Sequence, residues 1–446
     1  MKRFILSIAA LCCCAGLRAQ GDARIYRTEF IPFDTREEAD GRTRRNIDKY
    51  RTFEPRLLSD GEEILGLGET VEIPNAWLDS FVYLHLENAG TAYTLSVNGR
   101  EVAVVEDPFS PADFDLSPYL RQGENLLLLE LHKSTAPQLQ ERLSAAPVKP
   151  FTNSYLFAQE KRSIYDFNVA LEPDPTRKFG ILDLEVVLRN GYNYDEPITV
   201  GFDIYDPSGK LLDYSVNEFT VPGRSLDTVR FTPCIYHTNA NAWGGKDSSP
   251  LYRVMLYTKR NGTFREYIPF RVGFARPRLT AEGTLRYFDG ERPVVARRCD
   301  AGADAKVTRE QLETLKRQGV NLLLPSQPQP DWFYALCDGL GLAVIDCAGI
   351  DAPSRRDDRR VGGTPSNDPA LTAEYLDRVR AMYHRCRTHT CIVGFAPGNA
   401  SGNGYNMYKA YQWLKAAESL RPIVYSDADG EWNTDFEFAL PESGRN

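Results

Sequence analysis

The chain has 446 residues, of which 42% are hydrophobic, so it can bury several cores and is not an intrinsically disordered protein. Its formal net charge at pH 7 is −8, and this acidic balance excludes the large basic surface that binding to nucleic acid or anionic lipid requires. Neutral ligands such as sugars are compatible with this charge.

Residues 1–19 have the pattern of an export signal. Lys2 and Arg3 precede an apolar run over residues 4–17, and the last three residues, Leu-Arg-Ala, fit a cleavage site before Gln20. We therefore expect an exported mature protein, either periplasmic, cell-surface or secreted. The apolar run is too short to cross a bilayer, and no other stretch reaches roughly 20 apolar residues, so no transmembrane segment is expected.

The nine cysteines fall into two groups. The first group lies in the apolar run of the export signal and consists of Cys12, Cys13 and Cys14. A cysteine there could carry a lipid anchor, which is the alternative to signal-peptide cleavage before Gln20, but the residues before these cysteines fit a lipid-attachment signal poorly. The other six show no Cys-x-x-Cys spacing, so no zinc site is expected, and most lie in apolar runs, which favours core packing over disulfide pairing. These six are Cys234, Cys299, Cys337, Cys347, Cys386 and Cys391.

Residues 20–162 are predicted to form an antiparallel β-sandwich. Short runs rich in Val, Leu, Tyr and Phe are separated by turn signals, and residues 93–97 alternate strictly between apolar and polar. Asn98-Gly99 then predicts a tight hairpin, because both turn positions favour positive φ, and residues 102–105 are the returning strand.

Residues 163–274 form a second β region, which we predict to be an immunoglobulin-like β-sandwich. Its length of about 110 residues and the spacing of its strands are typical of that fold. The expected strands lie at residues 182–188, 198–204, 252–257 and 267–272.

Residues 275–446 alternate strands with helices, which predicts parallel βαβ units. Thr308-Arg-Glu-Gln311 reads as a capping box at a helix start. A complete (β/α) barrel needs about 250 residues, so we expect an incomplete TIM-type barrel with at most six strands. The expected strands are 321–324, 342–345, 392–396, 423–425 and 436–440, and the expected later helices are 332–339, 373–383 and 405–419.

Several motifs, in order, resemble the β-galactosidases of glycoside hydrolase family 2. Residues 109–120 with Gly-Glu-Asn at 123–125 resemble the sugar-binding jelly roll of that family, and Trp243 with residues 249–252 and 272–274 resembles the end of its immunoglobulin-like domain. Residues 333–338, 341–346, 387–389 and 398–402 resemble its barrel. The resemblance implies a jelly-roll sandwich, an immunoglobulin-like sandwich and a barrel, over residues 20–162, 163–274 and 275–446.

The resemblance also locates the catalytic positions. Retaining glycosidases need two carboxylates about 5 to 5.5 Å apart. The family acid/base glutamate corresponds to Ala400, which cannot transfer a proton, and the family nucleophile lies on a late barrel strand that we expect to be missing because the chain ends at Asn446. We therefore expect no catalytic residue, and hence a pseudoenzyme.

Fewer of the residues that bind metal and substrate in the family are present in this sequence. The family segment that helps to bind magnesium corresponds to residues 346–353, where Pro353 replaces its histidine and only Asp351 remains as a ligand, so neither a metal nor another cofactor is expected. Asn399 matches the residue that touches the sugar 2-hydroxyl in the family, although an Asn beside Gly also suits a turn. Asn399 and Asp351 are thus the candidate substrate-binding residues.

Other residues have ordinary explanations. An acidic loop follows one of the expected barrel strands and contains Asp427, Asp429 and Glu431. One of these residues would have to replace the missing catalytic acid, but acidic residues in such a loop are more often simply exposed to solvent. His389 is expected to be a hydrogen-bonded structural histidine. The candidate aromatic residues for stacking on sugars are expected to pack in the core instead; they are Trp332, Tyr405 and Trp413.

We therefore interpret the chain as an exported, inactive relative of β-galactosidase that binds a glycan or a protein partner as a scaffold. The alternative is a β-galactosidase or other β-glycosidase whose missing carboxylates come from another chain. A third, structural interpretation is an oligomer that covers the open edge of the incomplete barrel.

Overall fold

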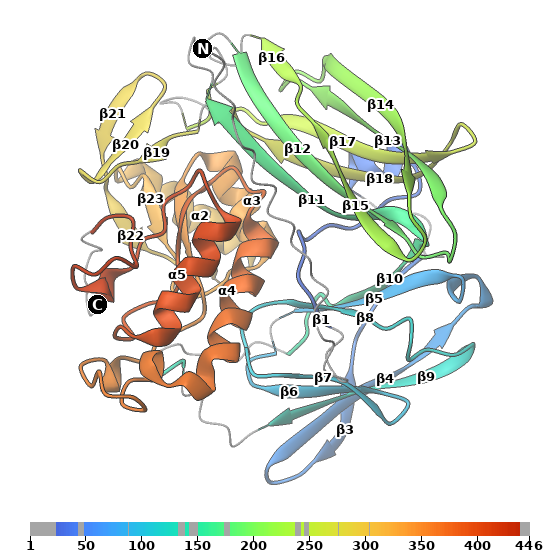
Figure 1. Ribbon diagram of the computed structural model, residues 1–446, viewed down its shortest axis with the longest axis horizontal. Helices are drawn as coiled ribbons and strands as arrows, with labels where there is room; N and C mark the ends of the chain where they lie inside the picture. Colours follow the sequence, from blue (N-terminus) through green and yellow to red (C-terminus); the bar gives the residue numbers. More distant parts are fainter. Residues whose placement is uncertain are drawn as a thin grey trace, which may run out of the picture.

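A computed structural model describes residues 24–42, 49–87, 89–132, 139–141, 150–173, 179–236, 242–244, 249–274, 276–302 and 304–437. The expected signal peptide, residues 1–19, lies outside these ranges. In Figure 1 two β-sandwiches are stacked on one side of the molecule, and an α/β region packs against both. Among the described helices, none is long and apolar enough to cross a membrane.

The first β-sandwich consists of two five-stranded sheets with the orders β1-β8-β5-β10-β2 and β3-β4-β9-β6-β7. Their inner faces enclose one apolar core, to which Leu84, Leu95 and Leu129 contribute. Asn98 and Gly99 have φ values of 52° and 76° and connect β6 to β7, as the hairpin signal predicted. The strands are β1 Arg24–Ile25, β2 Tyr50–Thr52, β3 Arg56–Asp60, β4 Ile64–Ile73, β5 Ser80–Leu86, β6 Tyr93–Val97, β7 Arg100–Val105, β8 Ala112–Asp115, β9 Gly123–His132 and β10 Tyr155–Glu160.

The second β-sandwich also has two sheets. One has the order β11-β12-β15, with β16 also paired to β12, and the other has the order β14-β13-β17-β18. Alternate residues of β12, such as Leu182 and Leu184, are buried in its core. The strands are β11 Arg162–Pro173, β12 Phe179–Asn190, β13 Glu196–Tyr205, β14 Leu211–Val221, β15 Ser225–Phe231, β16 Cys234–Tyr236, β17 Tyr252–Arg260 and β18 Thr263–Val272.

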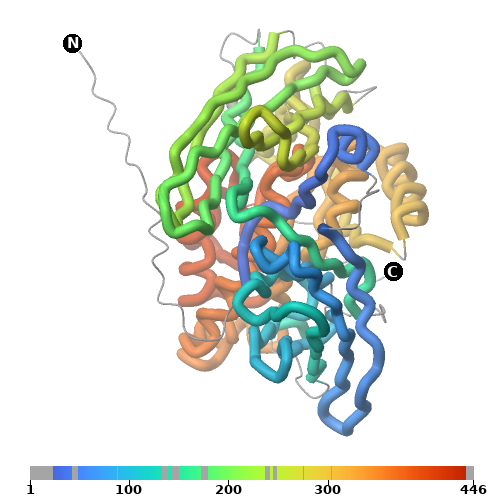
Figure 2. Tube along the Cα trace, turned by 90° about the vertical axis from the view of Figure 1, so that its right-hand side faces the viewer, coloured from blue at the N-terminus to red at the C-terminus, as the bar shows by residue number. Residues whose placement is uncertain are grey.

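Residues 24–42, which we call the N-terminal segment, join the two sandwiches. The segment starts as β1 in the first sandwich, and Phe33 then pairs with Tyr267 of β18 in the second. It ends in helix α1, Arg36–Gly41. Figure 2 shows this blue segment passing through the middle of the molecule.

The α/β region contains a four-stranded parallel sheet, β22-β23-β24-β25, with helices on one face. A small antiparallel sheet, β19-β20-β21, precedes it. The strands are β19 Arg278–Leu279, β20 Thr284–Tyr287, β21 Gly290–Pro293, β22 Ala296–Arg298, β23 Leu322–Leu324, β24 Ala343–Cys347 and β25 Ile392–Ala396. The α-helices are α2 Ala305–Arg317, α3 Asp331–Leu340, α4 Thr372–Cys386 and α5 Tyr405–Ala417, and short 3₁₀ helices span Asn75–Trp77, Pro353–Arg355, Pro365–Asn367, Pro369–Leu371 and Ser426–Ala428.

Both faces of the parallel sheet are buried, as the apolar composition of its strands requires. On one face Leu323 and Val344 pack with the helices. On the other face, which would be the interior of a barrel, Ile345 and Val393 belong to the same core as Leu285 of β20. The small antiparallel sheet therefore covers part of the interior face of this incomplete barrel.

Two expected strands of the barrel do not form as predicted. Residues 423–425 make a single bridge, in which Ile423 pairs with Phe395, because the amide of Tyr425 donates to Thr434 Oγ1 and the chain then turns. Of the expected strand 436–440, residues 438–440 lie outside the described ranges, and residues 436–437 are not in a strand.

The predicted start of helix α2 is also wrong. The N-cap is Asp304, whose carboxylate accepts hydrogen bonds from the amides of Lys306 and Val307 at 2.8 and 2.9 Å. Thr308 lies inside the first turn, and its hydroxyl donates to the carbonyl of Asp304. The aspartate four residues earlier therefore takes the capping role assigned to Thr308.

All six cysteines after residue 19 lie in the described part of the chain and are free thiols there. Five are buried, as expected for core packing, whereas Cys234 is exposed on β16. Burial raises the pKa of the Cys299 thiol to about 12, so this thiol stays protonated at neutral pH.

Candidate functional site

The loops that follow the four parallel strands meet at one edge of the sheet. Arg298 ends β22, Ser326 follows β23, Asp351 follows β24 and Asn399 follows β25. In α/β folds, ligand-binding residues collect at this carboxyl edge, because the loops there converge. We therefore call these four loops the strand-end site.

Asn399 lies at the centre of the strand-end site and is only 7% exposed. Its Oδ1 accepts a hydrogen bond from Arg298 Nη1 at 3.0 Å, and its Nδ2 donates to the carbonyl of Ser326 at 2.5 Å. Its backbone amide donates to the carbonyl of Ile350 at 2.8 Å. Both ends of the side-chain amide are thus engaged in linking three loops.

Ala400 is half-buried in the loop that follows β25. The loop is fixed on its far side, because the hydroxyl of Ser401 accepts a hydrogen bond from the amide of Ala352 at 3.0 Å. The next amide, that of Gly402, donates to Asp427 Oδ2 at 2.9 Å, and Gly402 has a φ of 71°. The methyl group of Ala400 therefore sits on a well-supported backbone, and it can neither donate nor accept a proton.

Asp351 is 2% exposed and pairs with a segment of the first sandwich. Its amide donates to the carbonyl of Leu139 at 2.5 Å, and its carbonyl accepts from the amide of Glu141 at 2.7 Å. Between these, Gln140 Nε2 donates to the carbonyl of Gly349 at 3.2 Å. The sequence did not predict that residues 139–141 reach the strand-end site, since no spacing rule links them to it.

Among the described residues, Asp351 belongs to no group of three His, Cys, Asp or Glu side chains close enough to share a metal ion. Asp351 and Asn399, the candidate substrate-binding residues, both lie in the strand-end site. The side chain of Asn399 and the backbone of Asp351 join loops of the protein to one another.

The acidic loop after residue 425 also lies at this edge. Arg359 pairs with Asp429 at 3.0 Å and with Glu431 at 2.5 Å. A hydrogen bond from Tyr408, together with Arg359, holds the pKa of Glu431 below its ordinary value. A general acid needs the opposite shift, so Glu431 is poorly suited to protonate a leaving group.

His389 lies at the opposite end of the parallel sheet, before β25 begins. Its Nδ1 lies 2.8 Å from Asp338 Oδ2, and its Nε2 lies 3.0 Å from Asp331 Oδ1. Burial opposes the charged imidazolium, but Asp338 and Asp331 outweigh it and raise the pKa of His389 to about 10. The imidazole is therefore a structural cation, in agreement with the sequence-based prediction.

The candidate stacking aromatics differ in exposure. Trp332 and Trp413 pack against the helix-side core, as expected. Tyr405 was expected in the core, but it is 43% exposed at the start of α5, with the ammonium of Lys409 5.5 Å from its ring centroid. Tyr405 thus remains available for contact with a ligand.

Sequence comparison identifies two regions of the chain. Residues 60–139 match "Glycosyl hydrolases family 2, sugar binding domain", and residues 296–440 match "Glycosyl hydrolases family 2, TIM barrel domain". The chain is a β-galactosidase-like member of glycoside hydrolase family 2. Its matched barrel region includes the strand-end site.

Curated relatives of this family 2 chain include a β-galactosidase of Priestia megaterium, 26% identical over 366 residues, which cover 78% of this chain and 35% of that enzyme. A β-galactosidase of Streptococcus thermophilus is 24% identical over 400 residues, which cover 86% of this chain and 37% of the relative. The chain therefore spans about a third of the length of these relatives.

Solved structures share the fold at low sequence identity. A β-glucuronidase of Bacteroides uniformis superimposes with a TM-score of 0.67 at 15% identity, over 81% of this chain and 46% of that chain. A putative β-galactosidase of Bacteroides fragilis gives 0.67 at 16% identity, over 85% and 59%. These likenesses support the fold of this family 2 chain.

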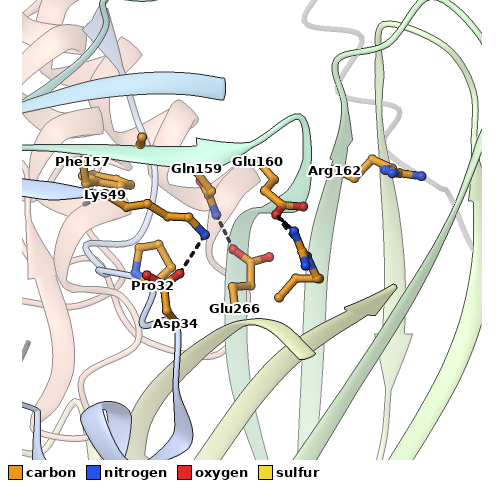
Figure 3. A pocket seen from close by; sticks show the side chains of 10 residues that line it. Pro32, Asp34, Lys49, Phe157, Gln159, Glu160, Arg162 and Glu266 are labelled. Atoms are coloured by element: carbon orange, nitrogen blue, oxygen red, sulfur yellow. Dashed lines mark hydrogen bonds and ion pairs between the residues drawn. The ribbon is translucent and has the colours of Figure 1, made fainter. Parts of the chain in front are cut away.

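Two of the cavities in the described part of the family 2 chain have polar or charged side chains in their lining and lie away from the strand-end site. One, of about 20 Å³, has room for a water molecule, and Figure 3 shows Lys49 paired with Asp34 and Gln159 bonded to Glu266 beside it. Burial raises the pKa of Glu266 to about 7. The other, of about 330 Å³, is lined by His389 and is therefore at the opposite end of the sheet from Ala400.

Proposed function

We propose that this family 2 chain is a carbohydrate-binding protein that does not hydrolyse glycosidic bonds. The observation that carries the proposal is Ala400 at the position of the family acid/base glutamate. Glycoside hydrolysis requires a carboxylic acid that protonates the leaving oxygen, and a methyl group cannot do so.

Neighbouring acids offer no replacement for that group. Asp427 Oδ2 accepts the amide proton of Gly402, Asp351 is buried in the pairing with residues 139–141, and Glu431 is ionised beside Arg359. The carboxylates of Asp427 and Glu431 are thus already used to hold loops, and Asp351 is buried where its backbone pairs with residues 139–141. This arrangement supports a structural role for the acids around the strand-end site.

The sugar-binding family region over residues 60–139 supports a carbohydrate ligand. Since the relatives are named β-galactosidases and β-glucuronidases, β-galactosides and β-glucuronides are the first ligands to test. A protein partner remains part of the proposal, with the sandwiches acting as a scaffold. We also propose export, which mass spectrometry of the mature chain would support by finding Gln20 at its N-terminus.

The decisive experiment assays the purified mature chain against nitrophenyl β-galactoside and nitrophenyl β-glucuronide. We expect no turnover, together with binding of one of these sugars in isothermal titration calorimetry. Ala400→Glu is tested beside Ala400→Gln, which has nearly the same shape but no titratable proton. Clear turnover by the natural chain would refute the proposal, and turnover gained only by A400E would place a working nucleophile within reach of position 400.

The second candidate is a β-glycosidase that completes its site with carboxylates from outside the matched region. The coverage of only 35% of a relative favours testing it, since two thirds of that enzyme have no counterpart in the match. Co-expression with the product of any adjacent reading frame that continues the barrel, followed by the same assay, distinguishes the two. Activity of the pair but not of the single chain would support this candidate.

We further propose that the open barrel edge pairs with a second copy or with another protein. In the described residues, β22 pairs with only one strand of the sheet, and the outer side of β25 meets only the single bridge between Phe395 and Ile423. Unpaired strand edges attract further pairing. Gel filtration tests this, and a monomer at all concentrations would count against it.

A further inference from the structure

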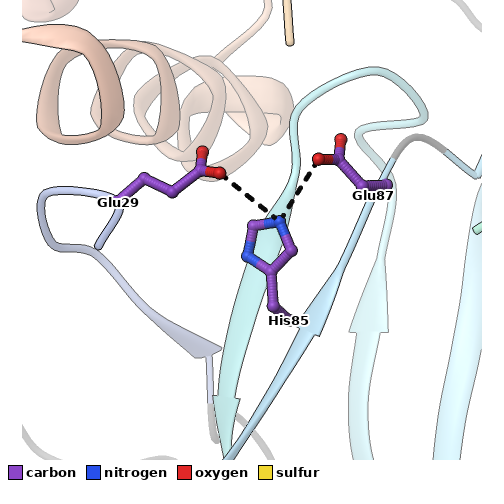
Figure 4. Close-up of side chains that lie close together, drawn as sticks. All are labelled: Glu29, His85 and Glu87. Carbon is purple, nitrogen blue, oxygen red and sulfur yellow. Dashed lines mark ion pairs between the residues drawn. The ribbon is translucent and has the colours of Figure 1, made fainter. Parts of the chain in front are cut away.

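Three polar side chains converge where the N-terminal segment crosses the first sandwich. Glu29 comes from the N-terminal segment, His85 lies near the end of β5, and Glu87 directly follows that strand (Figure 4). Positions two apart in a strand point to the same side, so His85 and Glu87 face Glu29 together. One ligand atom from each residue lies within 4.8 Å of the other two.

The imidazole of His85 is oriented by a fourth residue. His85 is 2% exposed, and its Nδ1 lies 2.7 Å from Asp113 Oδ1. An ionised carboxylate only accepts hydrogen bonds, so Nδ1 carries a proton and Nε2 is the ring nitrogen that can bind a metal ion. Arg27 Nε bonds the other oxygen of Asp113 at 3.2 Å and keeps this carboxylate in place.

The outward nitrogen of His85 has no hydrogen-bond partner in the described part of the chain, although it is buried. It lies 3.5 Å from Glu87 Oε1 and 3.8 Å from Glu29 Oε1. These distances are too long for strong hydrogen bonds, whose N to O separations are about 2.7 to 3.2 Å. The buried nitrogen therefore has ion-pair contacts with two carboxylates but no short hydrogen bond.

The same distances suit a shared metal ion. In a tetrahedral zinc site with bonds of about 2.0 to 2.2 Å, neighbouring ligand atoms are roughly 3.3 to 3.6 Å apart. The separations from His85 Nε2 need only a small closure to reach these values. A carboxylate that accepts a hydrogen bond from the other ring nitrogen, as Asp113 does, is the usual second-shell partner of a metal-binding histidine.

The surrounding charges leave this position to a cation. Arg385 Nη1 lies 3.9 Å from Glu29 Oε2, on the other oxygen of that carboxylate, so Glu29 Oε1 stays directed at His85. Arg27 and Arg385 each pair with one of the three carboxylates around the imidazole, counting Asp113, so one further positive charge at Nε2 of His85 balances the cluster. A metal ion bound at Nε2 takes the place of a proton there.

We propose that Glu29, His85 and Glu87 bind a divalent transition-metal ion, zinc in the first instance, with a water molecule at the fourth position. The ion fastens the N-terminal segment to β5 beside helix α4, and its role is structural. Imidazole with carboxylate ligands suits zinc, and three protein ligands leave a fourth tetrahedral position.

The test uses the full mature chain, freed of metal with a chelator and then titrated with zinc chloride by calorimetry. We expect one equivalent of zinc and a rise in the melting temperature. Glu87→Gln keeps the size of the side chain and should weaken zinc binding at least about 10-fold, as should Asp113→Asn through the second shell. Glu62→Gln, at an exposed glutamate of the same sandwich, should bind as the natural chain does.

Cobalt(II) provides an independent readout, because a tetrahedral site gives intense visible absorption and an octahedral one does not. We expect the tetrahedral spectrum with the natural chain and its loss in E87Q. Absence of zinc uptake by the natural chain, or equal uptake by E87Q, would overturn the proposal and leave an ordered water between the three side chains. Neither readout depends on sugar binding or hydrolysis.

Discussion

Single buried charges in this chain are balanced by specific partners, and His389 is the clearest case. Its two ring nitrogens both face carboxylates, one from each end of helix α3, and the ring also lies 5.3 Å from that of Tyr334. A histidine that is held as a cation cannot act as a base at neutral pH. The pairing therefore stabilises the fold at the end of the sheet remote from Ala400.

The pH dependence of stability should report on this group. Because Asp338 and Asp331 raise the pKa of His389 from 6.5 to about 10, its stabilising contribution is complete below pH 6.5 and is lost as the pH rises toward 10. His389→Gln should lower the free energy of unfolding by about 2 to 4 kcal/mol at neutral pH. This loss is smaller than for a fully buried ion pair, because the Asp331 side chain is 44% exposed.

Urea titrations of the natural chain and H389Q between pH 6 and 10 measure this effect. The difference in free energy of unfolding between the two proteins should shrink as the pH rises. His132→Gln, a change at a half-buried histidine whose Nε2 lies 3.0 Å from Thr94 Oγ1, is the control and should show a smaller difference. A constant difference for H389Q would contradict the assigned charge.

At the strand-end site, Ala400, Asn399 and Asp351 were singled out from the sequence by the resemblance of residues 346–353 and 398–402 to motifs of the family. The sequence did not reveal that Gln140 reaches the same site, nor that His85 faces Glu29. Those contacts join positions separated by tens or hundreds of residues, and no local period or motif encodes them. The sequence also indicated no metal ligands, because Glu29, His85 and Glu87 have no recognisable metal-binding spacing.

At the scale of single elements, prediction succeeded where the apolar pattern was strong. The expected helices 332–339, 373–383 and 405–419 correspond to α3, α4 and α5, with ends shifted by up to three residues. It failed where competing hydrogen bonds decide the ends. Helix α2 begins three residues before the expected capping box, because Asp304 offers an ionised acceptor to two amides of the first turn.

The cap of α2 can be tested with two substitutions. Asp304→Ala should lower the free energy of unfolding by about 1 kcal/mol, since two amides lose their acceptor. Gln311→Ala should leave stability nearly unchanged, because Gln311 is exposed inside the helix and Ala favours helix formation. Chemical denaturation followed by circular dichroism measures the free energy of unfolding of both variants. A larger loss of stability in Q311A than in D304A would show that the capping box at Thr308 starts the helix after all.

At the scale of the whole molecule, three parts of the chain meet at one buried ion pair. Arg387, which follows α4, donates to Asp166 Oδ2 of β11 at 2.6 Å and to the carbonyl of Phe167 at 3.1 Å. Asp166 Oδ1 accepts from the amide of Thr28 in the N-terminal segment at 2.9 Å. The barrel, the second sandwich and the N-terminal segment are thus fastened together by charges that are about 90% buried.

Removing one partner of this pair should therefore weaken the whole assembly. Arg387→Met leaves Asp166 buried without its counter-charge and should cost about 3 to 5 kcal/mol. Asp166→Asn removes the charge but keeps an Oδ1 acceptor for the amide of Thr28. The double variant, R387M with D166N, should lose less stability than the sum of the two single losses, by about 1 to 3 kcal/mol, because neither charge is left buried alone. Urea denaturation of the four proteins gives this coupling energy.

The surface pair between Arg230 and Glu185 supplies the control, since the Arg230 side chain is 58% exposed. Arg230→Met should cost less than about 1 kcal/mol, because solvent screens an exposed ion pair. If R387M cost no more than R230M, the three parts would be held together by apolar contacts alone. A second unfolding transition that appears only in R387M would instead show that this ion pair couples the barrel to the second sandwich, because loss of the pair would let one part unfold before the other.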